Sequence, residues 1–360
     1  MEKRGVSILS SCLITPLGLG TSETFEAIEA GISSVRSFDG RCMSLFTQKQ
    51  WDLLDAELPD ESDFSRFETL LFVAAKWAIL EANINPKSGR LLFMVVSAHG
   101  NCFIKSQLGF SSERAELPFS AKSLCSYFEN PNDPMVFSDM TISSYSAVKE
   151  AYKLLEEGIY DHIVVVAADV VPQAVAPNGG LEEELPCCLG GYKSQHQWVL
   201  GEAGAALVLS RYSGMGVGIR DVEVVTECNK MGEAANAIAL LFGTTQHDTH
   251  LVDVVTPSAP SQASGVAELK QLQVVGVAGK PTILLKGYFG HTMGVEGLLE
   301  AAVGAQLLLH NTLVEAVGTD ELTSIDANFQ ESTDRRFLKV CLKTMVDDEG
   351  RSAAILLAKN

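Results

Sequence analysis

Cysteine and histidine are the first side chains to consider for chemistry, because they supply many protein nucleophiles, bases and metal ligands. The 360-residue chain has eight cysteines, at 12, 42, 102, 125, 187, 188, 228 and 341, and none of them forms a C-x-x-C pair. This scatter predicts reduced, mostly buried thiols rather than a disulfide framework or a zinc site. Among the seven histidines, His247 and His250 have a metal-like spacing, but no second ligand pair lies nearby in the sequence. We therefore expect no metal.

The composition is that of a globular protein and excludes several classes of function. Hydrophobic residues make up 46% of the chain and charged residues 20%, and the formal net charge is −18. A field of that sign repels nucleic acid and anionic lipid. No apolar run approaches the length of a membrane span, and the N-terminus shows no signal-peptide pattern. We expect a soluble, cytoplasmic protein with no nucleic-acid or membrane partner.

Apolar periodicity predicts strands that alternate with helices along the chain, which defines an α/β protein. Residues 91–96 and 163–168 are continuous apolar runs, typical of parallel strands that helices cover on both faces. Helices are predicted over 23–30, 67–82 and 144–157, the first with Thr21 or Ser22 as its cap. Further strands are predicted over 5–14, 200–210, 251–255 and 283–285.

The chain also divides into two halves of similar layout. Gly-Val-Ser-Ile at 5–8 opens the first, and Gly-Val-Gly-Ile at 216–219 opens a comparable series of strands and helices. No Pro-, Ser- or charge-rich linker separates them. We expect two fused halves, residues 1–212 and 213–360, that form one compact unit.

Four segments, in order, resemble the β-ketoacyl-acyl-carrier-protein synthases of the thiolase superfamily. They are Thr-Pro-Leu-Gly at 15–18, Ser-Ser at 143–144 with its helix and the strand at 163–168, the glycine-rich strand at 201–209, and Lys-Gly-Tyr-Phe-Gly-His at 286–291. The matching spans residues 5 to 358 and is weak over 100–135 and 220–250. The resemblance implies a thiolase-like fold, in which two βα halves stack in five layers, αβαβα.

The family's chemistry needs a cysteine thiolate at a helix N-terminus, which takes an acyl group from a carrier thioester. Two histidines then donate hydrogen bonds while a malonyl carrier decarboxylates and attacks. In this chain the position of the cysteine is Thr141, two residues before Ser143. A threonine hydroxyl is far harder to deprotonate than a thiol and acts as a nucleophile only with an adjacent base. Cys125 is a conceivable substitute, but it lacks the small-residue turn and following helix that lower a thiol pKa.

Two further parts of the family's site also depart from the pattern. Val255 aligns with the first histidine, so one hydrogen-bond donor to the developing enolate is missing, a loss that typically costs about 10²–10³ in rate. The C-terminal aromatic gating loop is replaced by an acidic turn, Val-Asp-Asp-Glu-Gly at 346–350. Lys286 and His291 persist, and we expect Lys286 to be a buried or interfacial charge partner and His291 to satisfy buried backbone. Thr141, Val255, Lys286 and His291 are thus predicted to be vestigial and inactive.

A ketosynthase-like chain without its nucleophile resembles the chain-length factor of a type II polyketide system. That resemblance implies a heterodimer with an active ketosynthase, in which this subunit shapes the acyl tunnel and sets product length. We expect bulky side chains from the weakly matching segment to plug the tunnel or line the interface: Phe103, Ile104, Leu108, Phe110 and Phe119. No cofactor is expected for this subunit, because phosphopantetheine belongs to the acyl carrier protein.

The charge of the chain bears on how the carrier would dock. Carrier proteins of such systems are generally acidic, so a subunit of net charge −18 repels them. We expect the carrier to dock mainly on the ketosynthase, with a possible contact at Arg335, Arg336, Lys339 and Lys343. The alternatives are a homodimeric condensing or malonyl-decarboxylating synthase with an atypical nucleophile, and a non-catalytic homodimeric scaffold. The sequence leaves open the product, the interface and any residual decarboxylase activity.

Overall fold

The computed structural model describes residues 5–38, 41–59, 63–102, 113–171, 199–211, 214, 216–226, 236–244, 247–258, 262–317 and 327–360. Its first half contains these elements in order: β1 (Val6–Thr15), β2 (Gly18–Leu19), α1 (Thr21–Glu29), β3 (Arg36–Phe38), β4 (Arg41–Ser44), α2 (Gln48–Asp55), α3 (Arg66–Ala82), β5 (Leu91–Val96), η2 (Glu113–Ala115), α4 (Leu117–Tyr127), β6 (Met135–Phe137), η3 (Met140–Ile142), α5 (Ser143–Glu156), β7 (His162–Asp169), β8 (Leu200–Gly201) and β9 (Ala203–Arg211).

The second half follows with β10 (Val217–Val225), α6 (Asn236–Thr244), η4 (Thr249–Leu251), β11 (Val254–Pro257), α7 (Gln262–Val274), α8 (Lys286–Phe289), η5 (Met293–Val295), α9 (Glu296–His310), β12 (Thr312–Leu313), β13 (Asp334–Arg335), β14 (Val340–Val346) and β15 (Ser352–Lys359). The predicted boundary after residue 212 falls between β9 and β10. Within the described ranges, none of the helices combines the length and the hydropathy that a membrane crossing needs.

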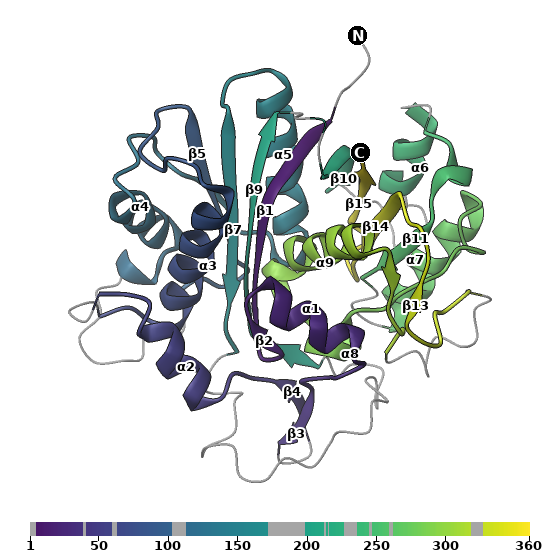
Figure 1. Cartoon of the computed structure of the whole chain (residues 1–360), viewed down its shortest axis with the longest axis horizontal. Coiled ribbons are helices and arrows are strands. Elements are labelled where there is room, and N and C mark those ends of the chain that lie inside the picture. The colour runs from purple at the N-terminus through teal and green to yellow at the C-terminus, as the bar shows by residue number, and fades with distance from the viewer. Residues whose placement is uncertain are drawn as a thin grey trace.

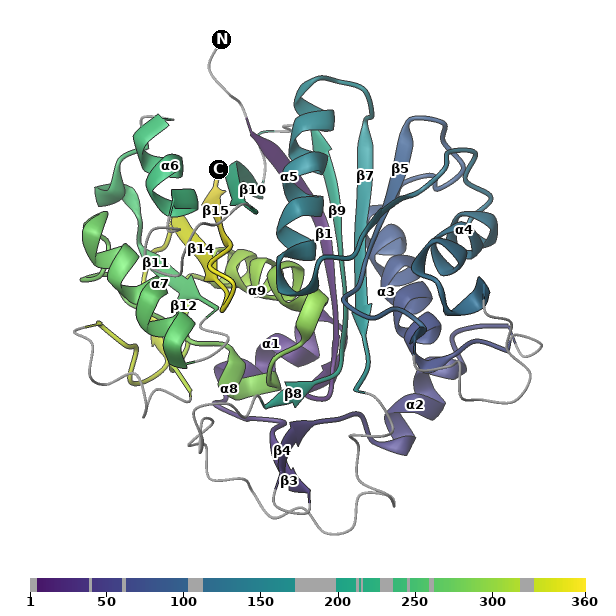
Figure 2. The ribbon, with the colours of Figure 1, turned by 180° about the vertical axis from the view of Figure 1, so that it is seen from behind.

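The large sheet runs in the order β11-β14-β15-β10-β1-β9-β7-β5-β6, so it contains strands of both halves. β1 and β10 pair antiparallel through Val6 and Ile219 at one end only, and the two parts of the sheet then diverge (Figure 1). Helices α5 and α9 lie between them, α3 covers the outer face of the first part, and α6 and α7 cover the outer face of the second (Figure 2). The result is the predicted five-layer α/β fold.

Burial explains why these segments form these elements. All residues of β5 are buried and so are seven of the eight in β7, as expected for strands covered on both faces. Helix α3 begins with a capping box, in which Ser65 and Glu68 each accept a hydrogen bond from the other's backbone N–H. The core between the two parts of the sheet joins residues of both halves, for example Val165, Val295 and Ile355. The halves are therefore packed into one unit.

The structure corrects several local predictions. Helix α1 begins at Thr21 itself, so its N-cap is Gly20, which has no side chain to cap it, and the Thr21 hydroxyl donates to the Ser11 carbonyl. The segment 283–285, predicted as a strand, forms no strand; its neighbour Thr282 makes isolated bridges only. The prediction that all cysteines are reduced is wrong at Cys42, which is disulfide-bonded. Sequence spacing does not show which cysteines a fold brings together.

Candidate functional site

Thr141 lies in the turn η3, between the edge strand β6 and the central helix α5, and its side chain is buried. The preceding Met140 has φ 50°, and this sharp turn is closed by Ser143, whose Oγ accepts from Asp139 N (2.6 Å) and donates to Met140 O (2.7 Å). In the part of the chain that the structure describes, no basic side chain lies within hydrogen-bonding distance of the Thr141 hydroxyl. A threonine without a base is a poor nucleophile.

Lys286 and His291 both reach the same oxygen of Glu296. Lys286 begins the short helix α8, His291 follows it, and Glu296 is the first residue of α9. Lys286 Nζ is 2.9 Å and His291 Nδ1 is 2.5 Å from Glu296 Oε2. All three side chains are buried or nearly so. The main chain of His291 is fixed as well, since its N–H donates to Val199 O and its carbonyl accepts from Gly201 N.

The protonation states of this trio follow from their surroundings. Burial raises the pKa of Glu296, but the charges of Lys286 and His291 and the hydrogen bond from His291 outweigh it and hold that pKa well below its ordinary value. Burial lowers the pKa of His291, which therefore carries a neutral imidazole at pH 7. Because a carboxylate can only accept, Nδ1 of His291 carries the proton and Nε2 carries the lone pair. A neutral His291 in this tautomer cannot donate from Nε2 to a developing oxyanion.

A second buried ion pair lies one helical turn further along α9. Lys343 of β14 is fully buried, and its Nζ is 2.5 Å from Glu300 Oε2. The same ammonium donates to Ser258 Oγ (2.7 Å), Thr256 O (3.0 Å) and Thr344 O (2.7 Å). Burial, against the attraction of Lys343, raises the pKa of Glu300 to about 7. Lys343 is therefore not part of a surface cluster with Arg335, Arg336 and Lys339, as its sequence neighbourhood suggested.

This pair is connected to the helix that follows Thr141. Tyr145 OH lies 3.0 Å from Ser258 Oγ, and the ring of Tyr145 packs on Gly297 so closely that a Cβ there would lie 2.6 Å from the ring. Ser144 Oγ donates to Gly294 O. Side chains of α5, α9 and β14 thus form one buried polar cluster, which extends from the helix that follows Thr141 to the start of α9. Glu296 and Glu300, four residues apart in an apolar helix, are the sequence signal that could have revealed it.

Val255 lies in β11 with its side chain in the outer hydrophobic cluster, together with residues such as Leu241 of α6 and Leu269 of α7. His291, by contrast, faces Glu296 at the start of the central helix α9. That Val255 replaces the family's first histidine remains a prediction.

The acidic turn at 346–350 is fastened to the turn of Thr141. Arg351 Nε is 2.7 Å from Asp347 Oδ2, and Arg351 NH1 is 2.5 Å from Asp139 Oδ1. Asp347 also accepts from the backbone N–H of Arg351 (2.8 Å). The turn between β14 and β15 is therefore held against η3 by an arginine that is 11% exposed.

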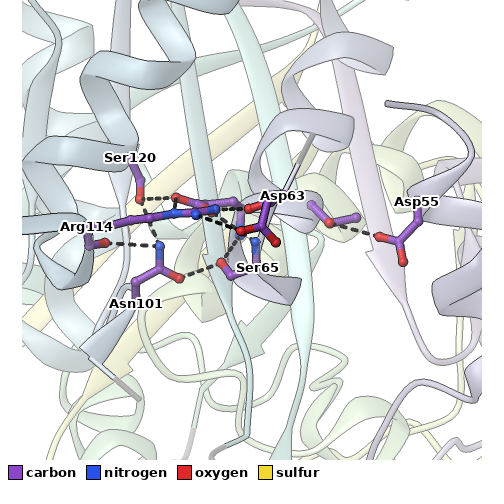
Figure 3. A network of polar contacts seen from close by, with 8 residues as sticks. Asp55, Asp63, Ser65, Asn101, Arg114 and Ser120 are labelled. Atoms are coloured by element: carbon purple, nitrogen blue, oxygen red, sulfur yellow. Dashed lines mark hydrogen bonds and ion pairs between the residues drawn. The ribbon is translucent and has the colours of Figure 1, made fainter. Parts of the chain in front are cut away.

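Of the predicted plug residues, Phe119 lies on α4 and is 39% exposed. Phe103, Ile104, Leu108 and Phe110 lie outside the described residues, so the plug remains a prediction. The two chain ends that flank residues 103–112 meet in a polar cluster (Figure 3). Asn101 accepts from Ser65 Oγ (2.6 Å) and donates to Arg114 O (3.3 Å) and Ser120 Oγ (3.2 Å).

The guanidinium of Arg114 completes that cluster with an ion pair to the buried Glu68 (2.7 Å), at the start of α3. Asn101 and Arg114, on either side of residues 103–112, are thereby anchored to helices α3 and α4.

Other candidate groups offer little reactivity. Burial, with a smaller contribution from Asp133, raises the pKa of Cys125 to about 11, and burial raises that of Cys341 to about 12. Neither thiol is a nucleophile at pH 7. His247 Nε2 lies 3.2 Å from Asp221 Oδ2, and His250 is exposed. No group of three potential ligands that could hold a metal ion occurs among the described residues.

The layered α/β architecture, with η3 at the start of the central helix α5, is also found in solved structures of other proteins. No protein-family model matches the sequence, and no curated protein matches it either. Solved structures do match over nearly the whole chain. One is described as the ishigamide ketosynthase/chain length factor, with a TM-score of 0.79 and 16% identity over 99% of this chain and 100% of that one.

A second match is a ketosynthase in complex with its chain length factor from Xenorhabdus doucetiae, with a TM-score of 0.79 and 17% identity over 99% of this chain and 98% of that one. A β-ketoacyl synthase from Burkholderia phymatum has a TM-score of 0.77 and 15% identity, with 99% of each chain covered. The chain therefore has the ketosynthase fold, as its sequence motifs predicted. At these identities the likeness establishes the fold alone.

Proposed function

We propose that this chain is a non-catalytic chain-length factor, which pairs with an active ketosynthase in carrier-protein-dependent chain extension. The observation that carries the proposal is the state of the site: a complete ketosynthase fold holds a threonine in the nucleophile turn, and the retained histidine donates to Glu296. Two of the similar structures are described as containing a chain length factor, which supports the same reading.

Condensation requires a group that attacks the thioester and donors that stabilise the resulting oxyanion. Thr141 has no base beside it among the described residues, and removing one oxyanion donor typically costs about 10²–10³ in rate. The neutral His291 directs its Nδ1 proton to Glu296, so its Nε2 repels an oxyanion instead of stabilising it. Two independent losses at one site support a silent subunit.

The fold offers a surface for the partner. Strand β6 is the last strand of the large sheet, and all three of its apolar residues, Met135, Val136 and Phe137, are half-buried. A half-buried apolar edge strand is a ready template for pairing with another chain. The nucleophile turn η3 follows β6 directly, with Met140 43% exposed. A ketosynthase bound at this edge would lie close to the turn that contains Thr141.

In that assembly this subunit acts sterically. Side chains that project across the interface set how many extension cycles fit into the partner's tunnel, and Phe119 is the candidate that the structure describes. The acyl carrier protein docks mainly on the ketosynthase, because the net charge of −18 repels an acidic carrier. This subunit needs no cofactor of its own.

The test is native mass spectrometry on the tagged chain, purified from cells that express a ketosynthase and a carrier protein from the same gene neighbourhood. The proposal requires a one-to-one heterodimer in which only the ketosynthase carries an acyl group. The matched control is the Thr141→Ala variant, which must give the same complex and the same acylation. A homodimer with an acyl adduct on this chain, absent from the alanine variant, would refute the proposal and establish an enzyme with an atypical nucleophile.

A further inference from the structure

The trio at the start of α9 has the composition of an anion-binding site that is already occupied. Lys286 and His291 approach one carboxylate oxygen, Glu296 Oε2, at 2.9 and 2.5 Å. Both are buried, with side-chain exposures of 11% and 2%. Lysine ammonium and imidazole N–H groups are both donors to carboxylates in proteins, and here the two converge on one buried point.

The Glu296 carboxylate does not satisfy all the hydrogen-bonding groups of this site. Lys286 Nζ contacts Glu296 as an ion pair but makes no directed hydrogen bond within the described part of the chain, and Thr292 Oγ1 and Glu296 Oε1 are also buried without hydrogen-bond partners there. Buried polar groups normally find partners, because each one left unmatched costs free energy. Lys286 and Thr292 therefore keep donor capacity that a freely placed anion could use better than a tethered one.

We propose that Glu296 is an internal ligand, which occupies a binding site for small carboxylates formed by Lys286 and His291. While Glu296 is in place, an acyl or carboxylate group from outside meets the lone pair of His291 Nε2 and an ammonium that is already neutralised. Without Glu296, the same pocket retains the cation and the imidazole donor and accepts a free carboxylate in trans. The inference concerns this chain alone and does not depend on the proposed pairing with a ketosynthase.

The experiment is chemical rescue of the full-length Glu296→Ala variant with sodium formate or acetate, followed by thermal unfolding. The alanine leaves a cavity of the size of a small carboxylate beside Lys286. We expect formate to raise the Tm of this variant with a saturable dependence, by about 2 °C at a tenfold excess over its Kd. Sodium chloride at matched ionic strength is the control for general salt effects.

Two matched variants separate site binding from general stabilisation. Glu296→Gln removes the charge but keeps the volume, so its pocket is filled and formate should have no more effect than chloride. The double variant Lys286→Met with Glu296→Ala has the cavity without the cation, and it should also lose the rescue. If formate stabilises all three variants and the wild type equally, or none of them, Glu296 is not an internal ligand.

A measurement on the wild type covers the case in which Glu296→Ala does not fold. The ¹⁵N chemical shifts of His291 report which ring nitrogen carries the proton. The proposal requires a protonated Nδ1 that donates to Glu296 and an unprotonated Nε2. The opposite tautomer, with the proton on Nε2, would mean that His291 does not donate to Glu296, and would overturn the inference. Neither experiment involves a partner or a product, so its failure leaves the proposed function to its own test.

Discussion

Glu202 provides a quantitative test of how burial governs the charge of a carboxyl group in this fold. It lies between β8 and β9 and is 5% exposed. Its Oε2 accepts from Phe46 N (3.0 Å) and its Oε1 accepts from Val171 N (3.2 Å). Burial raises its pKa from 4.5 to about 7, although those two hydrogen bonds and the charge of Arg66 act in the opposite direction.

The sign of the effect on stability follows from proton binding. Between pH 4.5 and 7 the folded protein holds a proton on Glu202 that the unfolded chain has lost, so the free energy of unfolding falls as the pH rises through this window. Each pKa unit corresponds to about 1.4 kcal/mol. Between pH 5 and pH 8, Glu202 therefore removes roughly 2–3 kcal/mol from the stability of the wild type.

The perturbation is Glu202→Gln, which keeps the shape of the side chain and cannot ionise. Urea unfolding at pH 5, 6, 7 and 8 should show that the variant loses roughly 2–3 kcal/mol less than the wild type over this range. Loss of one of the two backbone hydrogen bonds at the glutamine amide lowers the free energy of unfolding of the variant by the same amount at every pH. The difference in pH dependence between variant and wild type is therefore unaffected. Glu331→Gln, at an exposed position, controls for the loss of one negative charge. Parallel pH profiles for wild type and Glu202→Gln would refute the reasoning.

Three further predictions concern the site and the proposed tunnel. Thr141→Ala in the complex with a ketosynthase should leave product yield within about twofold, whereas a working nucleophile would lose more than about 10³-fold. Lys343→Met leaves the carboxyl of Glu300 buried without its cation, so urea unfolding at pH 8 should show a loss of about 3–5 kcal/mol. The double variant Lys343→Met with Glu300→Leu should recover most of this lost stability. Equal losses in the single and the double variant would show that the broken ion pair does not cause the destabilisation. Phe119→Ala should lengthen the products that mass spectrometry detects in the reconstituted complex, and an unchanged product spectrum removes Phe119 from the plug.

The elements that the sequence predicted correctly are those with strong local signals. The continuous apolar run at 91–96 is strand β5, and the helix expected over 67–82 is α3, Arg66–Ala82. In both segments, the apolar residues of the sequence pattern are the residues that the fold buries. The segment 283–285 has the same apolar character but lies in the connection between α7 and α8, where only its neighbour Thr282 forms isolated bridges, to Val255 and Phe329. A short apolar run does not distinguish a strand from a buried connection.

The candidate site could be located from the sequence, but its internal contacts could not. The resemblance pointed to Thr141, Lys286 and His291, and the structure places Thr141 in the turn before α5 and the other two residues on Glu296. Glu296 and Lys343 are charged residues in apolar surroundings. Glu296 pairs with Lys286, 10 residues before it, and Lys343 contacts Ser258, 85 residues before it. Such pairings depend on how α8, α9 and β14 pack together, which no local pattern encodes.

The pairing of β1 with β10 has a consequence for the order of events during synthesis on the ribosome. The strands β1, β5, β6, β7 and β9 are all complete by Arg211, so this part of the sheet can assemble while the rest of the chain is still being made. Until Val217–Val225 emerges, the edge of β1 lacks its neighbour, and the inner face of α5 lacks α9 until His310. Unpaired edges and exposed apolar faces favour aggregation. We therefore expect the nascent chain to need a chaperone most between about residue 211 and residue 310, the interval in which its first half is formed but uncovered.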